Sequence, residues 1–240
     1  MVEGAGRPRL SIIIPVLNDT AALATLLPTL DGDSTLEIIV VDGGQTREED
    51  GEPSSSTLAT RHPAVVWMRS ARGRGAQMNC GARRARGEWL IFLHADTRLG
   101  PGWRQVFPPL DANARIVGGS FRFVLDSTSA WARWIERGVR LRVRLFDLAY
   151  GDQALFARRT AFETMGGYKD MPLMEDVDFI RRLRRLGRLE HAAIPAITSA
   201  RRWERDGWIR RSVENVALVL LFFAGRSPEA LARQYQRRTH

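Results

Sequence analysis

The chain has 240 residues, a length that suits one large domain or one domain with an appended helical segment. Its 36 Lys and Arg residues outnumber its 27 Asp and Glu residues, which gives a formal net charge of +9, and Lys169 is the single lysine. Arginine binds planar anions through a two-pronged fork, so phosphorylated ligands, nucleic acid or an anionic membrane surface would suit this charge, but a genome that favours Arg codons explains it equally well.

Other counts narrow the class of protein. Cys80 is the single cysteine, which excludes an internal disulfide and a cysteine-rich zinc site. The first ten residues contain no apolar stretch of signal-peptide length, so we expect a cytoplasmic protein. The longest apolar run, 216–225, is shorter than the ~20 residues that cross a bilayer, which predicts a buried or surface-lying helix.

The first hundred residues alternate between two patterns. Apolar runs that predict strands lie at 10–16, 37–41, 64–68 and 89–93, and helical patterns lie at 20–30 and 74–86. Strands that are apolar throughout are typical of a parallel sheet covered on both faces. The alternation therefore predicts an α/β fold with the strand–helix order of a nucleotide-binding domain.

The second half follows a different rhythm. Strands at 118–125 and 153–159 are candidates for antiparallel pairing, and a Trp- and Arg-rich stretch, 128–146, separates them. Helical patterns follow at 174–186, 206–225 and 228–237. We predict one compact domain over 1–205, with 206–240 as a helical annex packed on it. The segment 45–62 is polar and rich in turn residues.

Polar residues follow three of the predicted parallel strands, where open α/β sheets bind their ligands. They are Pro15, Asn18 and Asp19 after the first strand, Asp42, Gly43 and Gly44 after the second, and His94 and Asp96 after the fourth. A single Asp at a turn is commonly a cap, but three at successive strand ends favour binding. A carboxylate there can accept from ribose hydroxyls, and glycine lets a ligand approach the backbone.

Two short patterns add detail to this edge of the sheet. His94 and Asp96 are two residues apart, which in an extended chain puts two potential metal ligands on one face. Gly73 and Gly75 flank Arg74 where the helix 74–86 begins, without the Lys-Ser/Thr ending of a P-loop. An arginine near a helix N-terminus still suits a phosphate or a base edge.

Five ordered segments carry a family resemblance: "SIIIPVLND", "EIIVVDGG", "RGRGAQMNCGARRARGEWLIFLHADT", "YGDQALFARR" and "MPLMEDVDFIRRLRRLGR". Together they resemble family 2 glycosyltransferases of the GT-A fold, and most closely a short bacterial subgroup associated with arsenosugar biosynthesis or radical-enzyme gene neighbourhoods. The resemblance covers about residues 10–210. It implies a Rossmann-like, mostly parallel sheet, a nucleoside-diphosphate sugar donor (UDP-sugar favoured), a divalent metal, Mn²⁺ or Mg²⁺, and an inverting displacement at the anomeric carbon.

The resemblance also implies roles on the donor side. Asp42 looks like the carboxylate that reads the nucleoside, and His94 and Asp96 occupy the site of the family's metal-holding Asp-x-Asp. Because His94 replaces the first Asp of that motif, Asp96 is the expected main ligand, and an imidazole would shift preference towards Mn²⁺. The expected donor-binding residues are Pro15, Asn18, Asp19, Asp42, Gly44, Arg74, Asn79 and Asp96.

The acceptor side is implied in the same way. Asp176 matches the catalytic base, which takes the proton of the attacking hydroxyl. Its neighbours Glu175 and Asp178 suit a helix N-terminus on electrostatic grounds alone. The expected residues on the acceptor or diphosphate side are Asp152, Gln153, Arg202 and Trp203. For Arg202 and Trp203, a solvated arginine patch remains an equal alternative.

Two functions other than glycosyl transfer are suggested by parts of the sequence. A sugar-phosphate nucleotidyltransferase usually has a Gly-rich loop after its first strand, but "PVLNDTAAL" has no glycine. A protein that binds an anionic surface would suit the charge and the basic run at 137–146, although no recognised nucleic-acid motif is present, so we expect no nucleic-acid partner. The run "VALVLLFF" is apolar on every side and needs cover. We therefore expect self-association through 208–225, with peripheral membrane contact at the inner face as the alternative.

Overall fold

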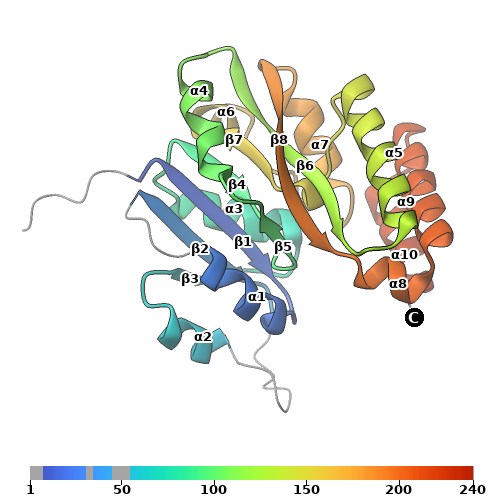
Figure 1. The fold of residues 1–240 in the computed structure, drawn as a ribbon, viewed down its shortest axis with the longest axis horizontal. Coiled ribbons are helices and arrows are strands. Elements are labelled where there is room, and N and C mark those ends of the chain that lie inside the picture. Colours follow the sequence, from blue (N-terminus) through green and yellow to red (C-terminus); the bar gives the residue numbers. More distant parts are fainter. Residues whose placement is uncertain (1–7, 31–34, 45–54, 240) are drawn as a thin grey trace, which may run out of the picture.

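The computed structural model describes residues 8–30, 35–44 and 55–239, with side chains as far as 236. Among these residues one sheet forms the centre of the molecule, with the strand order β3-β2-β1-β4-β7-β6-β8-β5 (Figure 1). The strands are β1 (Leu10–Val16), β2 (Leu36–Asp42), β3 (Val66–Arg69), β4 (Trp89–Phe92), β5 (Thr97–Leu99), β6 (Ile116–Asp126), β7 (Leu155–Arg158) and β8 (Arg188–Ser199).

Helices cover the sheet and extend beyond one end of it (Figure 1). They are α1 (Thr20–Leu26), α2 (Ser55–Arg61), α3 (Arg74–Arg84), α4 (Phe107–Asp111), α5 (Ala130–Phe146), α6 (Arg159–Thr164), α7 (Glu175–Leu183), α8 (Arg201–Asp206), α9 (Trp208–Phe223) and α10 (Pro228–Thr239). Short 3₁₀ turns lie at Leu27–Thr29, Trp103–Val106 and Gly151–Gln153. The helix α2 lies inside the stretch predicted to be a polar loop; residues 45–54 of that loop are outside the described residues.

The parallel half of the sheet confirms the predicted α/β fold. β1 pairs in parallel with β2 and β4, and β2 pairs in parallel with β3. On β1, Ile12 and Ile14 belong to one apolar core, whereas Ile13 belongs to the core on the opposite face. Because both faces are covered, each of these strands is a continuous apolar run. Gly81 lets α3 lie close to β1, since a Cβ there would come within 2.5 Å of Ile13.

The other half of the sheet contains the antiparallel strands. β7 pairs antiparallel with β4 and β6, which confirms the expected antiparallel pairing, and β8 lies between β6 and β5. The predicted strand 153–159 begins later, at Leu155, because the preceding residues form a 3₁₀ turn that ends in Ala154 with a φ of 46°. The stretch 128–146, for which the sequence predicts no element, contains the helix α5 from Ala130 onward. Ser129 caps this helix, because its hydroxyl accepts from the Trp131 N–H.

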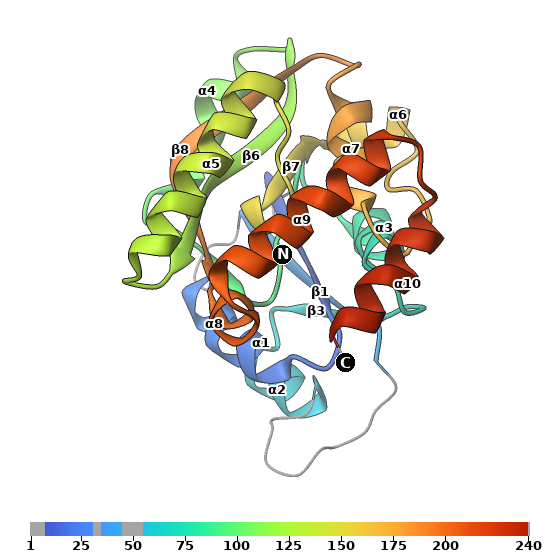
Figure 2. The ribbon, with the colours of Figure 1, turned by 90° about the vertical axis from the view of Figure 1, so that its right-hand side faces the viewer.

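The C-terminal helices pack against the same domain. The predicted helix 206–225 is confirmed as α9, which begins two residues later because Gly207, with a φ of 87°, separates it from the preceding helix α8. Figure 2 shows α9 between α5 and α10. Leu218 and Val219 of α9 are buried, whereas Val216 and Leu220 are 58% and 63% exposed, so α9 is covered on one side. Among the described residues, none of the helices combines the length and the hydropathy needed to cross a membrane.

Candidate active site

Two adjoining cavities lie at the carboxyl ends of β1 and β4. The first, about 1030 Å³, is lined by Pro15, Asp19 and Arg72 among others, and we call it the strand-end cavity. The second, about 180 Å³, is lined by Asp152 and Asp176 among others, and we call it the carboxylate cavity. The two share the residues Arg74, His94, Asp96, Leu173, Glu175, Arg202 and Tyr235. The position agrees with the rule that open α/β sheets bind ligands at these strand ends.

The strand-end cavity brings carboxylates and arginines together. Arg201, at the start of α8, forms an ion pair with Asp19, and its Nη2 lies 3.6 Å from Asp96 Oδ2. Arg74 contributes its guanidinium from the N-terminus of α3, where its Nη1 donates to Glu175 Oε1 at 2.9 Å. The cavity therefore carries groups for binding both a cation and a phosphate. The sequence did not single out Arg201, because its partners lie more than a hundred residues away.

A second polar cluster lies beside this cavity, at the end of β2. The Oδ1 atom of Asp42 accepts from the Gly44 N–H at 2.7 Å, and its Oδ2 accepts from the Ser55 hydroxyl at 2.8 Å. Asn18 lies next to them: a Cβ added to Gly44 would be 3.2 Å from Asn18 Oδ1. The residues Asn18, Asp42 and Gly44 are thus adjacent to one another, but they line neither of the two cavities, whereas we expected all the strand-end residues to share one crevice.

His94 and Asp96 line both cavities, but not for the reason predicted. The chain is not extended there: it turns, and the Thr97 N–H donates to the His94 carbonyl at 3.1 Å. Burial, together with Arg74 and Arg202, lowers the pKa of His94 well below its usual value. The imidazole is therefore neutral at pH 7, and its buried Nε2 has no hydrogen-bond partner among the described residues.

Asp96 and His94 could supply part of the coordination shell of a divalent cation, with a bound substrate supplying the rest. A carboxylate and a neutral imidazole are both suitable donors to Mn²⁺. Within the described part of the chain, no group of three His, Cys, Asp or Glu side chains forms a complete metal site. A cation at Asp96 and His94 would therefore take its remaining ligands from bound phosphates and water, as Mg²⁺ and its relatives commonly do.

The carboxylate cavity contains two aspartates with different surroundings. Asp176 is fixed by backbone donors: Oδ2 accepts from the Gly151 N–H at 2.7 Å and Oδ1 from the Val177 N–H at 2.8 Å. Asp152 has a buried Oδ1 without a hydrogen-bond partner among the described residues. Burial raises the pKa of Asp152 to about 6, with Arg142 opposing the shift and Asp176 adding to it. A carboxyl group with such a pKa can exchange protons near neutral pH.

The other predicted residues fall into two groups. Arg202 lines both cavities, and Trp203 lines the carboxylate cavity. Asn79 instead exchanges two hydrogen bonds of 2.8 Å with the backbone of Tyr168. Gln153 is buried and accepts from the Arg142 guanidinium and the Tyr150 N–H. Asn79 and Gln153 thus lie behind the cavities, where they hold neighbouring segments in place.

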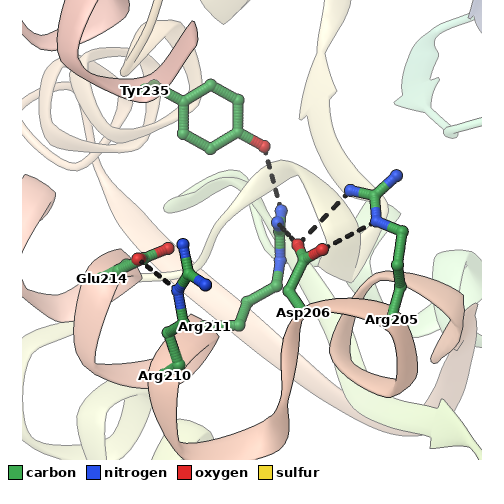
Figure 3. A network of polar contacts seen from close by, with 6 residues as sticks. All are labelled: Arg205, Asp206, Arg210, Arg211, Glu214 and Tyr235. Atoms are coloured by element: carbon green, nitrogen blue, oxygen red, sulfur yellow. Dashed lines mark hydrogen bonds and ion pairs between the residues drawn. The ribbon is translucent and has the colours of Figure 1, made fainter. Parts of the chain in front are cut away.

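Residues from α9 and α10 complete the cavities, and sequence reasoning missed them. Figure 3 shows the buried Arg211 between Asp206 and Tyr235, where it donates to the Asp206 carboxylate at 2.7 Å and to the Tyr235 hydroxyl at 2.9 Å. Arg205, and to a lesser extent Arg211, lowers the pKa of Asp206 to about 2. This network joins α8, α9 and α10 and positions Tyr235 at both cavities. No local sequence pattern predicts it, because the partners meet only after the helices pack.

The fold and the cavities define an α/β protein whose ligand site lies at the carboxyl ends of parallel strands. A family model described as Glycosyl transferase family 2 matches residues 11–173. The chain belongs to this family, and the enzyme class predicted from the five motifs, a glycosyltransferase, is confirmed. The matched segment includes His94, Asp96 and Asp152 but ends before Asp176 and Arg202.

Curated relatives agree over part of the chain. A PGL/p-HBAD biosynthesis glycosyltransferase of Mycobacterium bovis is 33% identical over 94 residues, which are 38% of this chain and 37% of the relative. An uncharacterized glycosyltransferase of Haemophilus influenzae is 35% identical over 89 residues, which are 36% of this chain and 29% of the relative. The matches thus span about a third of the length of these relatives.

Solved structures support the GT-A fold. S. aureus TarS 1–349 in complex with UDP-GlcNAc superposes with a TM-score of 0.60 at 14% identity, covering 80% of this chain and 58% of that one. The mannosyltransferase PcManGT from Pyrobaculum calidifontis, in complex with GDP-Man and Mn²⁺, has a TM-score of 0.60 at 17% identity, covering 93% of this chain and 66% of that one. At these identities the likeness concerns the fold, and the predicted fold class is confirmed.

Proposed function

We propose that this protein transfers a glycosyl group from a nucleoside-diphosphate sugar to the hydroxyl of a small-molecule or lipid-linked acceptor. The observation that carries the proposal is the arrangement of the two cavities. One collects Asp96, Arg74 and Arg202 at the strand ends, and the other holds Asp152 and Asp176 next to it. The family membership and the nucleotide sugars bound by TarS and PcManGT support it.

The strand-end cavity is the proposed donor site. Its arginines suit a diphosphate, because guanidinium groups bind phosphate oxygens through paired hydrogen bonds. Asp42 is the proposed acceptor of hydrogen bonds from the nucleoside, and UDP-sugars are the favoured donors. The neighbouring residues Pro15, Asn18, Asp19 and Gly44 are proposed to shape the same edge.

Asp96, assisted by His94, is proposed to hold a divalent cation, Mn²⁺ or Mg²⁺, on the donor diphosphate. When bound, such a cation offsets the negative charge that grows on the leaving diphosphate. Asp96 also faces Arg201, since Asp96 Oδ2 lies 3.6 Å from Arg201 Nη2. Cation binding therefore competes with this ion pair.

Asp176 is proposed to act as the catalytic base in an inverting displacement. The acceptor oxygen forms a bond to the anomeric carbon while the bond from that carbon to the diphosphate breaks, and the hydroxyl proton moves to the carboxylate. The two backbone hydrogen bonds to Asp176 keep its carboxylate oriented. Asp152, with its free oxygen, is proposed to hold the acceptor hydroxyl.

A donor screen tests this proposal. The protein is incubated with UDP- and GDP-sugars and Mn²⁺, and the melting temperature and the release of nucleoside diphosphate are measured. A ligand that binds the folded state alone at a hundred times its Kd stabilises it by about 2.7 kcal/mol. In a parallel assay with UTP and a sugar 1-phosphate, a nucleotidyltransferase would release pyrophosphate, and an anionic-surface binder would be stabilised by oligonucleotides or vesicles. Either result, with nucleotide sugars inert, would refute glycosyl transfer.

The proposal has three narrower features, which concern the acceptor, self-association and membrane contact. The resemblance to the arsenosugar-associated subgroup supports a small-molecule pathway for the acceptor. Two exposed apolar side chains of α9, Ile209 and Val213, support the proposed self-association through 208–225. Arginines and exposed tryptophans on α5, among them Trp131 and Trp134, support peripheral membrane contact as the alternative.

A further inference from the structure

A third cavity, of about 800 Å³, lies between α5 and α9, and we call it the apolar groove. Both views show these two helices as neighbours at one end of the molecule (Figures 1 and 2). Most of its wall is apolar: Ile135, Val139 and Phe146 contribute from α5, and Val216, Leu220 and Phe223 from α9. Such a surface gains free energy when an apolar ligand covers it.

The groove is continuous with the proposed catalytic pocket. It shares the lining residues Tyr150, Asp152, Trp203, Asn215 and Val219 with the carboxylate cavity, but shares none with the strand-end cavity. The carboxylate cavity therefore lies between the proposed donor site and the groove. A molecule in the groove would reach the anomeric carbon from the side of Asp152 and Asp176.

The polar group at the junction is ready to bind a hydroxyl. Asp152 Oδ1 is buried and has no partner among the described residues. A buried acceptor without a partner costs free energy, and a ligand hydroxyl at this point would remove that cost. The junction thus joins a hydroxyl-binding carboxylate to an apolar channel.

The interior of α5 leaves the groove open at Gly138. A Cβ added there would meet nothing within 4 Å. Glycine inside a helix is less favourable than alanine, so this position lowers helix stability while it widens the groove. On α9 the wall runs from Ser212 to Phe223, ~16 Å at the helical rise, and its apolar part begins at Val216, ~10 Å before Phe223, which is about the length of an extended octyl chain.

From these observations we propose that the acceptor is an amphiphile: its hydroxyl-bearing end lies at Asp152 and Asp176, and its apolar chain occupies the groove between α5 and α9. This inference rests on the proposed glycosyl transfer, because the amphiphile is an acceptor only in that reaction. It names the chemical class of the second substrate, which neither the motifs nor the family membership gives.

The test measures binding of methyl, butyl and octyl β-D-glucosides, below their micelle concentrations, by calorimetry on the full chain with UDP and Mn²⁺ present. Each methylene that enters the groove should increase affinity between about two- and fourfold, the range from half to full burial. Gly138→Phe fills the groove and should remove the gain from butyl to octyl. The matched control, Gly138→Ala, also improves the helix but leaves the groove open, and should keep that gain.

UDP affinity, measured separately on each variant, reports whether the fold and the donor site are intact. Equal affinities for butyl and octyl glucoside, or failure of both to bind, would overturn the inference. So would a chain-length gain that survives in Gly138→Phe, because the chain would then lie elsewhere, as on an exposed helix face that also binds anionic vesicles. Failure of UDP and nucleotide sugars to bind would instead refute the proposed function, whatever the glucosides do.

Discussion

The buried carboxyl group of Asp152 should make the stability of the protein depend on pH. Its pKa is raised to about 6, mainly by burial, whereas an unfolded aspartate titrates near 3.9. Between these values the folded state binds the proton more tightly, so stability increases as the pH falls through 6 and the gain is complete below about 4. Linkage with these two pKa values gives about 1.4 kcal/mol between pH 8 and pH 5. For a chain of this size that is a shift in melting temperature of roughly 3–6 °C.

The measurement compares wild type with Asp152→Asn in urea unfolding at pH 5, 6, 7 and 8, with EDTA present. Asparagine does not titrate, so the difference between the two proteins should change by about 1.4 kcal/mol over this range, in favour of the wild type at pH 5. Asp126→Asn is the control, because Arg98 lowers the pKa of Asp126, which therefore titrates below this range. If wild type and Asp152→Asn show parallel pH dependence, Asp152 is an ordinary solvated carboxylate, and the view of it as an acceptor-holding group fails.

Three further predictions concern the proposed reaction and assembly. Asp96→Ala should abolish transfer and metal-dependent donor binding, as measured by calorimetry with UDP and Mn²⁺, while His94→Ala should be milder, because the carboxylate is the main ligand; wild-type turnover in Asp96→Ala would refute the metal assignment. Asp176→Asn keeps the shape but cannot take a proton, so transfer should fall roughly 10²–10⁴-fold with donor affinity unchanged, and an equal loss of donor binding would make Asp176 a donor-site residue. Light scattering at micromolar protein without detergent should show self-association that Val213→Glu on α9 disrupts, and a monomer that also ignores anionic vesicles would contradict both proposed uses of the exposed face of α9.

The parallel half of the sheet could be predicted because of how it is buried. Ile12, Ile13 and Ile14 are all fully buried, since helices cover both faces of β1. Such strands appear in the sequence as unbroken apolar runs, and the residues that follow them necessarily meet at one edge. This rule predicts that Asp19, Asp42 and Asp96 lie at one edge of the sheet, but not that Asp42 lies outside both cavities.

The elements that were missed differ in their sequence patterns. On α5 the apolar and basic residues recur at helical spacing, so this periodicity could have predicted the helix. β8 alternates between exposed and partly buried residues and contains Pro195, which argues against a central strand. It nevertheless pairs with β6 on one side and with the short β5 on the other. Whether such a segment forms a strand depends on the strands it pairs with rather than on the preference of its own sequence.

The two halves of the proposed site differ in the same way, and this explains why the proposed donor side is the more predictable one. Donor-side residues such as Asp96 follow parallel strands inside the segment that the family model matches, 11–173. Much of the acceptor side lies beyond it: Asp176 opens α7, Asn215 lies on α9 and Tyr235 on α10. These side chains meet only because Arg211 holds the last helices together and α9 packs beside α5. The proposed nucleotide site can therefore be predicted from local motifs, whereas the proposed acceptor site depends on the packing of helices that no motif describes.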